Sequence, residues 1–325
     1  MYEAELRLRR PLVTGSSVWQ TRPTFFLKTE GQGGQRWSEA APLQGWGSES
    51  LDECRDSLTR WVQNGERPST PAARFAVDML DEDFRSVRTE VQFTLGALGI
   101  AETVSEIGLA VESGFSTVKL KVGADSVTRD VQRVAEVSRS FPAVRLRVDA
   151  NGAWSFEEAK RFLEDSRFFS IDLVEQPVAP DKLAELRTLT DLRIAPIGAD
   201  ESANRADLRD VMLAQRMVDA VVLKPSVFGS IFELRSYVEA ADDAGVRVVF
   251  SSAIETSIGR RAVGHLAQSL GVKEPSGLHT GHWLERDVAW GRVERGNLCF
   301  DEPLLPAAME EFLKDATLIT EAENP

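Results

Sequence analysis

Cysteine, histidine and long apolar runs are all scarce in this chain of 325 residues. The two cysteines, Cys54 and Cys299, lie far apart and predict no disulfide framework. No apolar signal segment follows Met1 and no apolar run is long enough to cross a bilayer, so a soluble cytoplasmic protein is expected. His279 and His282 form an H-x-x-H pair, but no third ligand at zinc-binding spacing is near, which favours a loop or strand-end role.

Basic residues are also in deficit. The chain has Lys+Arg 38 against Asp+Glu 51, which gives a net charge of −13. A surface of this sign argues against nucleic acid or an anionic membrane as the main partner. An anionic small molecule is still compatible, because lysines and a metal ion can dominate the field inside a pocket. The expected partner is therefore a small molecule, and the sequence leaves the oligomeric state open.

The first part of the chain predicts an α+β module. Residues 1–45 alternate polar and apolar side chains in segments separated by a Gly-rich turn, which is typical of an antiparallel meander. Helices are predicted over 49–64, after Ser48, and over 71–81, after a Ser-Thr-Pro start signal.

From Val91 onward the pattern changes to strands that alternate with helices. This alternation predicts parallel strand pairing and an α/β barrel. The expected domains are an N-terminal α+β capping domain over 1–90 and a (β/α) barrel over 91–296. The tail, 297–325, is expected to be irregular, then weakly helical, and to return to the first domain.

Five charged residues end or follow consecutive predicted strands of the barrel. The steps between them are 28, 26, 25 and 24 residues, which is the period of a strand-helix repeat; the residues are Lys121, Asp149, Glu175, Asp200 and Lys224. The C-terminal ends of barrel strands meet at one face, where barrel active sites are built. The spacing therefore places five charges at one site.

The three carboxylates in this series predict a metal site. Asp149, Glu175 and Asp200 would repel one another unless a cation lay between them. Ligation by oxygen alone, with no Cys or His nearby, favours Mg²⁺ over zinc, with Mn²⁺ as the alternative. One such carboxylate indicates little, since a DANG segment is more often a simple turn, but three in register are specific.

Two lysines on one predicted strand complete the series. Lys119 and Lys121 share a face of the strand, whereas Val118 and Leu120 take the other face. Helices cover the outside of a barrel, so the apolar face points outward and both lysines point into the barrel mouth. A buried lysine beside another cation has its ammonium form disfavoured and can act as a base. Lys224 would face Lys121 across the carboxylates. The K-x-K tripeptide alone fits a solvated edge strand equally well.

Polar residues after two strands are candidate substrate contacts. Asn151 follows Asp149 in a turn, and a second group follows the seventh predicted strand; its members are Ser251, Ser252, Glu255 and Thr256. Surface loops have this composition too, but a position on the active face of a barrel makes substrate contact a reasonable expectation.

This set of residues resembles the enolase superfamily, specifically its muconate-lactonizing subgroup, and the resemblance covers nearly the whole chain. It rests on K-x-K at the second strand, Asp, Glu and Asp at the third to fifth, and Lys at the sixth. The segments VFSSAIETSIGR (249–260) and GLHTGHWL (277–284) are most similar to the o-succinylbenzoate synthases of menaquinone biosynthesis, of the actinobacterial type. The implied fold is a modified (β/α)8, TIM-like barrel of the (β/α)7β kind with an N-terminal α+β capping domain.

The resemblance also implies a reaction, carried out by a Mg²⁺-dependent carbon-oxygen lyase. This reaction is the syn-dehydration of 2-succinyl-6-hydroxy-2,4-cyclohexadiene-1-carboxylate to 2-succinylbenzoate through an ene-diolate. Lys121 abstracts the α-proton and then helps hydroxide to depart, while the three carboxylates hold the metal. Lys224 stays cationic on the other face. Lys119 lowers the pKa of Lys121 and contacts the substrate carboxylate.

Several alternatives remain open from the sequence. A racemase of N-succinylamino acids would use both lysines as opposed bases, and a muconate-type cycloisomerase shares the first step. A dipeptide epimerase is disfavoured, because those members of the subgroup carry an acidic pair at the eighth strand, where this chain has His279-Thr280-Gly281. Two alternatives from other functional classes also remain open. One is a Schiff-base aldolase that uses Lys224, and the other is a barrel that binds a ligand without turnover. The capping loop that sets specificity in the family is predicted near 13–19, where no recognisable code is present.

Overall fold

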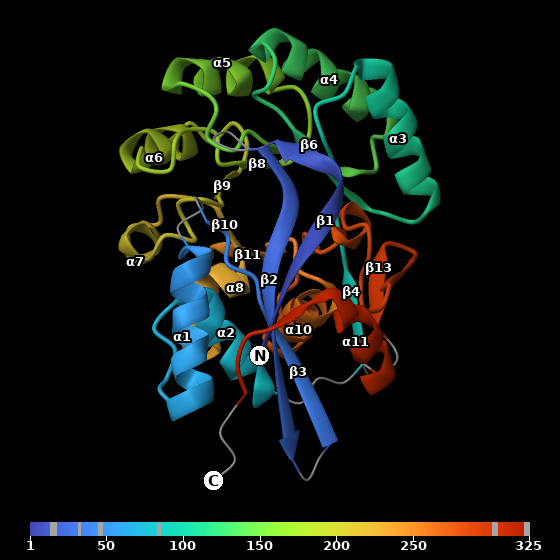
Figure 1. Ribbon diagram of the computed structural model, residues 1–325. Coiled ribbons are helices and arrows are strands. Elements are labelled where there is room, and N and C mark those ends of the chain that lie inside the picture. The colour runs from blue at the N-terminus through green and yellow to red at the C-terminus, as the bar shows by residue number, and fades with distance from the viewer. Residues whose placement is uncertain (14–17, 32–33, 45–47, 83–85, 301–304, 322–325) are drawn as a thin grey trace.

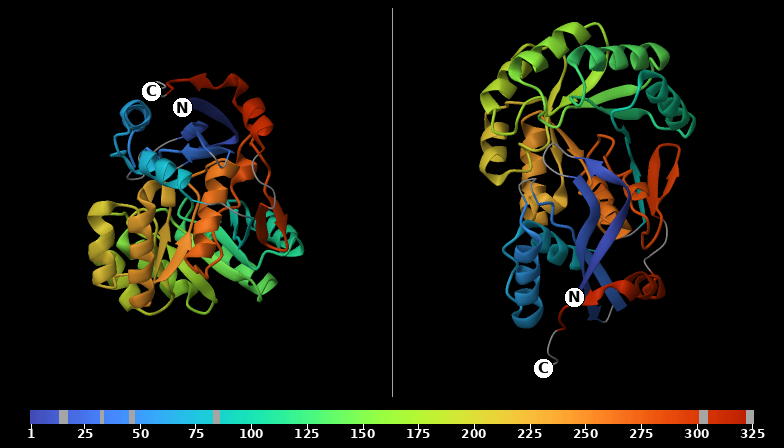
Figure 2. Two further views of the ribbon diagram at one scale, coloured as in Figure 1. Left: turned by 90° about the horizontal axis from the view of Figure 1, so that it is seen from below. Right: turned by 45° about the horizontal axis from the view of Figure 1, so that its top comes forward.

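A computed structural model of the protein, shown in Figure 1, describes residues 1–13, 18–31, 34–44, 48–82, 86–300 and 305–321. An antiparallel sheet with two helices forms one end of the molecule, and a curled parallel sheet surrounded by helices forms the other (Figures 1 and 2). This is a modified (β/α) barrel with an N-terminal α+β capping domain. The predicted capping loop near 13–19 lies in part outside the described residues. No helix in the described ranges is long and apolar enough to span a membrane.

The capping domain is built on an antiparallel sheet that includes the chain's tail. In the described residues its strand order is β14-β1-β2-β3. Their bounds are Thr317–Leu318 for β14, Tyr2–Val13 for β1, Val18–Gly31 for β2 and Gly34–Ala40 for β3. Tyr2 pairs with Phe26 on one side and with Leu318 on the other. The tail therefore returns to the first domain, where the Met1 ammonium group also donates to the Thr320 carbonyl at 2.8 Å.

Two helices cover this sheet, α1 (Leu51–Asn64) and α2 (Pro71–Leu80). Their apolar sides pack on the sheet in a common core; its members include Phe25, Leu27, Cys54, Leu58 and Ala76. Helix α1 begins two residues later than the predicted 49–64. The reason is a capping box, in which Ser50 and Glu53 satisfy each other's backbone N–H groups.

The barrel sheet runs in sequence order within residues 86–300. It has seven parallel strands, ordered β11-β10-β9-β8-β7-β6-β5. The strand bounds are β5 Phe93–Leu95, β6 Thr117–Lys121, β7 Arg145–Asp149, β8 Ile171–Glu175, β9 Ile197–Ala199, β10 Ala220–Leu223 and β11 Arg247–Phe250. The helices between them are α3 Ile100–Glu112, α4 Val127–Ser140, α5 Phe156–Ser166, α6 Leu183–Asp191, α7 Ala206–Ala214, α8 Pro225–Phe228 and α9 Ile231–Asp243, and α10 Ser257–Ser269 follows β11.

Within residues 86–300 the barrel closes without a regular eighth strand. Ser276 bridges to Val91 beside β5, and Gly277 bridges to Ser251 at the end of β11. A Cβ at Gly277 would lie 2.6 Å from the Ser251 hydroxyl oxygen, so any other residue here would force the Ser251 side chain to shift. The weak eighth strand predicted here is therefore two bridges, followed by the 3₁₀ turn η1 (Gly281–Trp283).

A small antiparallel sheet, absent from the sequence predictions, lies beside the barrel. Its strands are β4 (Val87–Glu90), β12 (Arg292–Glu294) and β13 (Asn297–Phe300), in the order β12-β13-β4. The expectation of an irregular start to the tail was wrong, because β13 pairs with a segment about 200 residues earlier in the chain. Helix α11 (Pro306–Phe312), the turn η2 (Leu313–Asp315) and β14 then follow.

The interior of the barrel is polar at both ends and apolar between them. Leu173, Ala220, Val222 and Val249 form the middle layer. At the N-terminal end, fully buried Arg147 pairs with Asp172 at 2.9 Å and also with Glu274. Paired charges of this kind at the bottom of a barrel serve stability, whereas barrel active sites lie at the opposite, C-terminal end.

Candidate functional site

A cavity of about 850 Å³ lies at the C-terminal ends of the barrel strands, beneath the capping domain. Among the described residues, the capping domain contributes Pro11, Leu12, Trp19 and Leu43 to its lining. The barrel supplies the charged part of the lining, which includes Lys119, Lys121, Asp200, Glu201 and Lys224. The site therefore requires both domains.

Strand register places the predicted charges at one level. Lys121 is the parallel partner of Asp149, and Asp149 is the partner of Glu175, so three adjacent strands end together. Asp200 and Lys224 come one residue after the ends of β9 and β10. Residues at equivalent positions of neighbouring strands point to the same face. The structure thus brings all five residues of the predicted series together.

Lys119 and Lys121 both bind the carboxylates. Lys119 Nζ donates to Asp149 Oδ2 at 2.9 Å and to Glu175 Oε1 at 2.8 Å. Lys121 Nζ donates to Asp149 Oδ2 at 2.6 Å and to Asn151 Oδ1 at 2.6 Å. The solvated edge-strand interpretation of K-x-K is excluded, because Lys119 is buried and β6 lies between two other strands.

On the other side of the carboxylates, Lys224 pairs with Asp200. Asn204 supports both residues: its Nδ2 donates to Asp200 Oδ1 at 3.0 Å, and its Oδ1 accepts from the Lys224 backbone N–H at 2.8 Å. Three strands, β7, β8 and β9, separate Lys224 from Lys121 in the sheet, and both lysines line the same cavity. Two lysines therefore approach one cavity from different sides.

Burial controls the protonation of this cluster. Burial, reinforced by Asp149, raises the pKa of Glu175 to about 8. Burial acts in the same direction on Asp149, but the ammonium groups of Lys119 and Lys121 outweigh it and lower the pKa of Asp149 well below its usual range. Burial would lower the pKa of Lys119, yet the surrounding carboxylates raise it. Without a further cation the charge on Glu175 is therefore disfavoured, whereas the charge on Asp149 is stabilised by the two lysines.

The donor set fits a hard divalent cation. Among the described residues no three acidic, histidine or cysteine side chains are arranged as a closed metal site, because the lysines hold the carboxylates instead. However, the donors are all oxygens, and Glu201 adds a fourth carboxylate whose Oε2 is buried without a hydrogen-bond partner. Burial and the neighbouring Asp200 raise the pKa of Glu201 to about 7. Asp149, Glu175 and Asp200 are the residues that would hold Mg²⁺.

Asn151 connects the two halves of the site. It adopts φ 46°, in the left-handed region that asparagine tolerates. Its Oδ1 accepts from Lys121, and its Nδ2 donates to Glu201 Oε1 at 3.0 Å. Asn151 lines the cavity, as a substrate contact must, and it also orients the proposed base.

The polar residues after β11 divide into two groups. Ser251 and Ser252 line the cavity, together with Ile254. Glu255 and Thr256 are buried behind this lining, and their polar atoms bind protein groups. In this structure the second pair supports the lining instead of forming it.

His279 and His282 are absent from the cavity lining but adjoin residues that belong to it. The ring of His279 is 5.1 Å from that of Phe115 and 4.6 Å from that of His282, measured between centroids. Burial lowers the pKa of His279 to about 4. Their neighbours Thr280 and Trp283 do line the cavity. His279 lies in a turn and His282 in the 3₁₀ turn η1, which agrees with the loop alternative of the predicted loop or strand-end role.

The sequence predicts a specificity loop near 13–19, whose last residue, Trp19, does line the cavity, but it gives no sign of the rest of the capping domain's contribution. Trp19 and Leu43 belong to the cavity, and Arg22 and Glu39 contact the barrel loop next to it. No local signal distinguishes these residues from others in an antiparallel sheet. Glu201, by contrast, adjoins Asp200 in sequence, so its place in the site was detectable.

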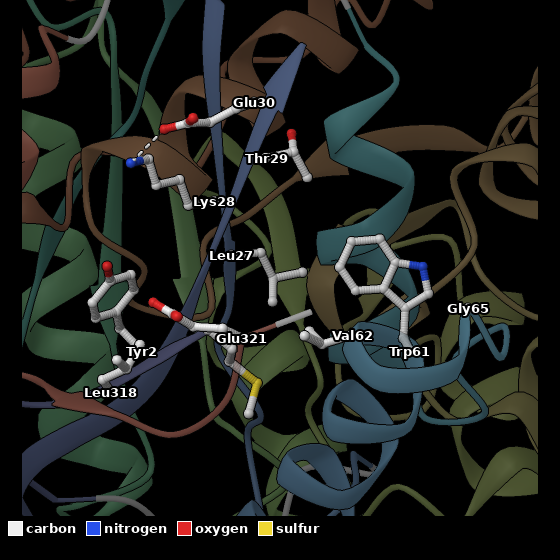
Figure 3. Close-up of a pocket in the computed structure, with 11 residues that line it drawn as sticks. Tyr2, Leu27, Lys28, Thr29, Glu30, Trp61, Val62, Gly65, Leu318 and Glu321 are labelled. Carbon is white, nitrogen blue, oxygen red and sulfur yellow. Dashed lines mark ion pairs between the residues drawn. The ribbon is translucent and has the colours of Figure 1, made fainter. Parts of the chain in front are cut away.

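A second, smaller hollow lies within the capping domain. Figure 3 shows it between Trp61 and Val62 of α1 and the β1–β2 strands, with Lys28 and Glu30 paired at its edge. Its volume is about 510 Å³. Trp19, at the opposite end of β2, belongs to the larger cavity, so the two hollows are separate. The smaller one lacks the lysine-carboxylate cluster and carries no comparable chemistry.

Comparison with known proteins places this geometry in a family. The o-succinylbenzoate synthase of Enterobacter sp. (strain 638) is 31% identical over 89% of this chain and 92% of its own length. The L-Ala-D/L-Glu epimerase of Bacillus subtilis is 35% identical over 55% of this chain, and the match spans only 50% of that protein. The structure of the Thermosynechococcus elongatus o-succinylbenzoate synthase, which has Mg in its active site, aligns with a TM-score of 0.79 at 26% identity, over 96% of this chain and 98% of that one.

A family model described as enolase C-terminal domain-like matches residues 102–306, which is well over half of the chain. The match covers the barrel strands that carry both lysines and all three predicted metal ligands. On this match, and on the shared architecture of barrel and capping domain, the chain belongs to the enolase superfamily of enzymes.

Proposed function

We propose that this chain is an o-succinylbenzoate synthase, a lyase that acts in menaquinone biosynthesis. The observation that carries the proposal is that Lys121 and Lys224 enter one cavity from opposite sides of three buried carboxylates. Such a site is suited to a carbon atom next to a carboxylate, from which a proton must be removed. Relatives that carry this name match the chain over most of their length, for example 92% in Enterobacter and 94% in Proteus mirabilis.

The roles of the lysines follow from their contacts. Lys121, oriented by Asn151, accepts the proton from the carbon next to the substrate carboxylate. As an ammonium group it then gives that proton to the departing hydroxyl, which leaves as water. Lys224 remains positively charged beside Asp200 and stabilises the developing negative charge. When bound, Mg²⁺ supplies further positive charge to the substrate carboxylate.

The lining of the cavity disfavours a dipeptide substrate. A dipeptide carries an ammonium group, which needs a carboxylate partner when it is desolvated. Among the described lining residues the only carboxylates are Asp200 and Glu201, both at the end of the cavity where the predicted metal ligands lie. Away from that end the lining is apolar or hydroxylic; it includes Trp19, Leu43, Ile254, Ser252 and Thr280. This distribution favours a substrate without an ammonium group over the dipeptides of the epimerases.

A racemase of N-succinylamino acids is the second candidate. The same two lysines could act as opposed bases on the two faces of one carbon. The N-succinyl Arg/Lys racemase of Bacillus cereus shares the fold with a TM-score of 0.84, but at 18% identity this similarity concerns the fold alone. Both reactions begin with the same proton transfer, so the roles of the lysines in the first step are common to both.

A substrate panel with and without EDTA decides between the two candidates. The panel contains the hydroxycyclohexadiene carboxylate, N-succinylamino acids of both hands, and a dipeptide. We expect fast dehydration, slow racemisation and loss of both with EDTA. Fast racemisation with slow dehydration would assign the racemase instead. Activity that survives EDTA, together with trapping of Lys224 by borohydride, would point to Schiff-base chemistry.

A further inference from the structure

Three charged residues are buried where the capping domain meets the barrel. Arg22 on β2 is 2% exposed, Glu39 on β3 is 1% exposed, and Glu255, after β11, is 0% exposed. Burial of a charge is costly unless hydrogen bonds compensate it. The partners of these groups therefore show what the cluster holds in place.

Arg22 connects the capping domain to the loop that follows β11. Its Nε donates to the Ala253 carbonyl at 3.1 Å, and its Nη atoms donate to the carbonyls of Ala41 at 2.6 Å and Pro42 at 2.5 Å. The guanidinium carbon also lies 5.7 Å from the centroid of the Trp19 ring. Ala253 and Trp19 both line the cavity, so one side chain spans its two walls.

Glu39 binds the first turn of helix α10 from the other domain. Its carboxylate accepts from the Thr256 hydroxyl at 2.6 Å, from the Thr256 backbone N–H at 3.0 Å and from the Gly259 N–H at 3.0 Å. A carboxylate at the N-terminus of a helix satisfies N–H groups that have no partner within the helix. A Cβ at Gly259 would lie 2.5 Å from Glu255 Cβ and 3.1 Å from Glu39 Oε2, so both acidic side chains pack against Gly259.

Glu255 fixes the loop from inside the barrel. It accepts from the Ser252 hydroxyl at 2.7 Å, from the Ala253 N–H at 2.7 Å and from the Ser226 hydroxyl at 2.8 Å. The Ser252 oxygen in turn accepts from the Ile254 N–H at 2.7 Å. The amides of Ala253, Ile254 and Thr256 are thus all held by side chains and not by regular secondary structure.

The loop needs this support because its backbone is strained. Ile254 adopts φ 65°, a conformation that is unfavourable for a β-branched residue. Such a conformation persists where the surroundings over-determine it, and it often does so at functional sites. Ile254 lines the cavity, so its conformation shapes the space available to the substrate.

We propose that Arg22 and Glu39 are positioning residues, which hold loop 251–256 from the capping domain in the one conformation that completes the substrate cavity. That the cavity completed by this loop binds the substrate rests on the proposed function. The capping domain would then determine substrate affinity through the barrel loop as well as through its own contacts. Neither Arg22 nor Glu39 lines the cavity, so neither is placed to contact the reacting atoms.

The test compares two buried arginines. Arg22→Met and Arg22→Lys remove or weaken the contact to Ala253, whereas Arg147→Met removes an equally buried arginine at the bottom of the barrel. In the unliganded protein, hydrogen-deuterium exchange of the amides at 253, 254 and 256 should rise at least tenfold in Arg22→Met, less in Arg22→Lys, and not in Arg147→Met. Glu39→Gln gives a second measurement, with faster exchange at Thr256 and Gly259.

Kinetics then separate positioning from general stability. KM should rise about tenfold in Arg22→Met while kcat stays within threefold, and Arg147→Met should lower the melting temperature with KM unchanged. The proposal is overturned if loop exchange does not change, or if it changes while KM does not. If the unaltered protein turns over no compound of the panel, the proposed function fails, and the exchange measurement alone then decides the role of Arg22 and Glu39.

Discussion

The ammonium nitrogen of Lys121 lies 2.6 Å from Oδ2 of Asp149, so the proposed base and a proposed metal ligand share a hydrogen bond. Their strands also place them directly side by side, as partners in the β6–β7 pairing. A cation on Asp149 and the ammonium group of Lys121 therefore compete for the same oxygen. Metal binding at Asp149 and the availability of Lys121 to act as a base are therefore coupled through this one contact.

Lys121→Ala should slow exchange of the substrate α-proton in deuterated water by on the order of 100-fold or more, because it removes the general base. Mg²⁺ affinity should be kept or slightly raised, because a competitor for Asp149 is gone. NMR measures the exchange and calorimetry the affinity. Lys160→Ala, on the surface of α5, serves as the control and should change neither. Unchanged exchange in Lys121→Ala would remove Lys121 from the mechanism.

Lys224→Ala should reduce turnover by about 100-fold or more, because it removes a positive charge that stabilises the transition state. Slow exchange of the α-proton should persist, since Lys121 is intact. Lys224→Arg, which keeps the charge, should recover part of the turnover. A different result would identify two opposed bases. In that case Lys121→Ala would lose α-proton exchange for one enantiomer of an N-succinylamino acid, and Lys224→Ala would lose it for the other enantiomer.

Glu175→Gln should weaken Mg²⁺ binding by roughly 100-fold or more, because it removes a charged ligand, and the loss of even an outer-shell partner costs about 10- to 100-fold. The metal-free protein should be no less stable, because burial and the adjacent Asp149 already disfavour the charge on Glu175. Asp172→Asn, at the opposite end of the barrel, provides the matched control. It should lower stability by breaking pairs with Arg147 and Arg145, and leave Mg²⁺ affinity unchanged. Calorimetry and urea unfolding give the two readouts, and equal Mg²⁺ affinities in both variants would contradict the assignment of Glu175.

Glu39 should make stability depend on pH. Burial raises the pKa of Glu39 from 4.5 to about 7 in the folded protein. Between these values the folded state binds more protons than the unfolded state, so the free energy of unfolding falls as pH rises. The loss is complete above pH 7 and amounts to roughly 3 kcal/mol. Glu39→Gln, compared with the unaltered protein by urea unfolding at pH 4.5 and pH 8, should remove this share of the dependence. Parallel pH profiles would show that Glu39 does not titrate in this range.

The barrel and its charged series were accessible from the sequence because both depend on local pattern. The K-x-K alternation assigns Lys119 and Lys121 to one face of β6, since side chains alternate along a strand. The strand-helix repeat then brings Asp149, Glu175 and Asp200 to the same end of the sheet. Neither inference needs to know which distant segments meet.

The tertiary structure decided everything that depends on segments far apart in the chain. Arg22 and Glu39 meet residues 253–259 across more than 200 positions, and β13 pairs with β4 over a similar separation. A buried arginine or glutamate in an antiparallel sheet has no local signature, because its partner is chosen by domain packing and not by its neighbours in sequence. The residues that perform the proposed chemistry are therefore visible in the periodicity of the chain. The residues that shape the cavity around them become visible only when the capping domain is in place against the barrel.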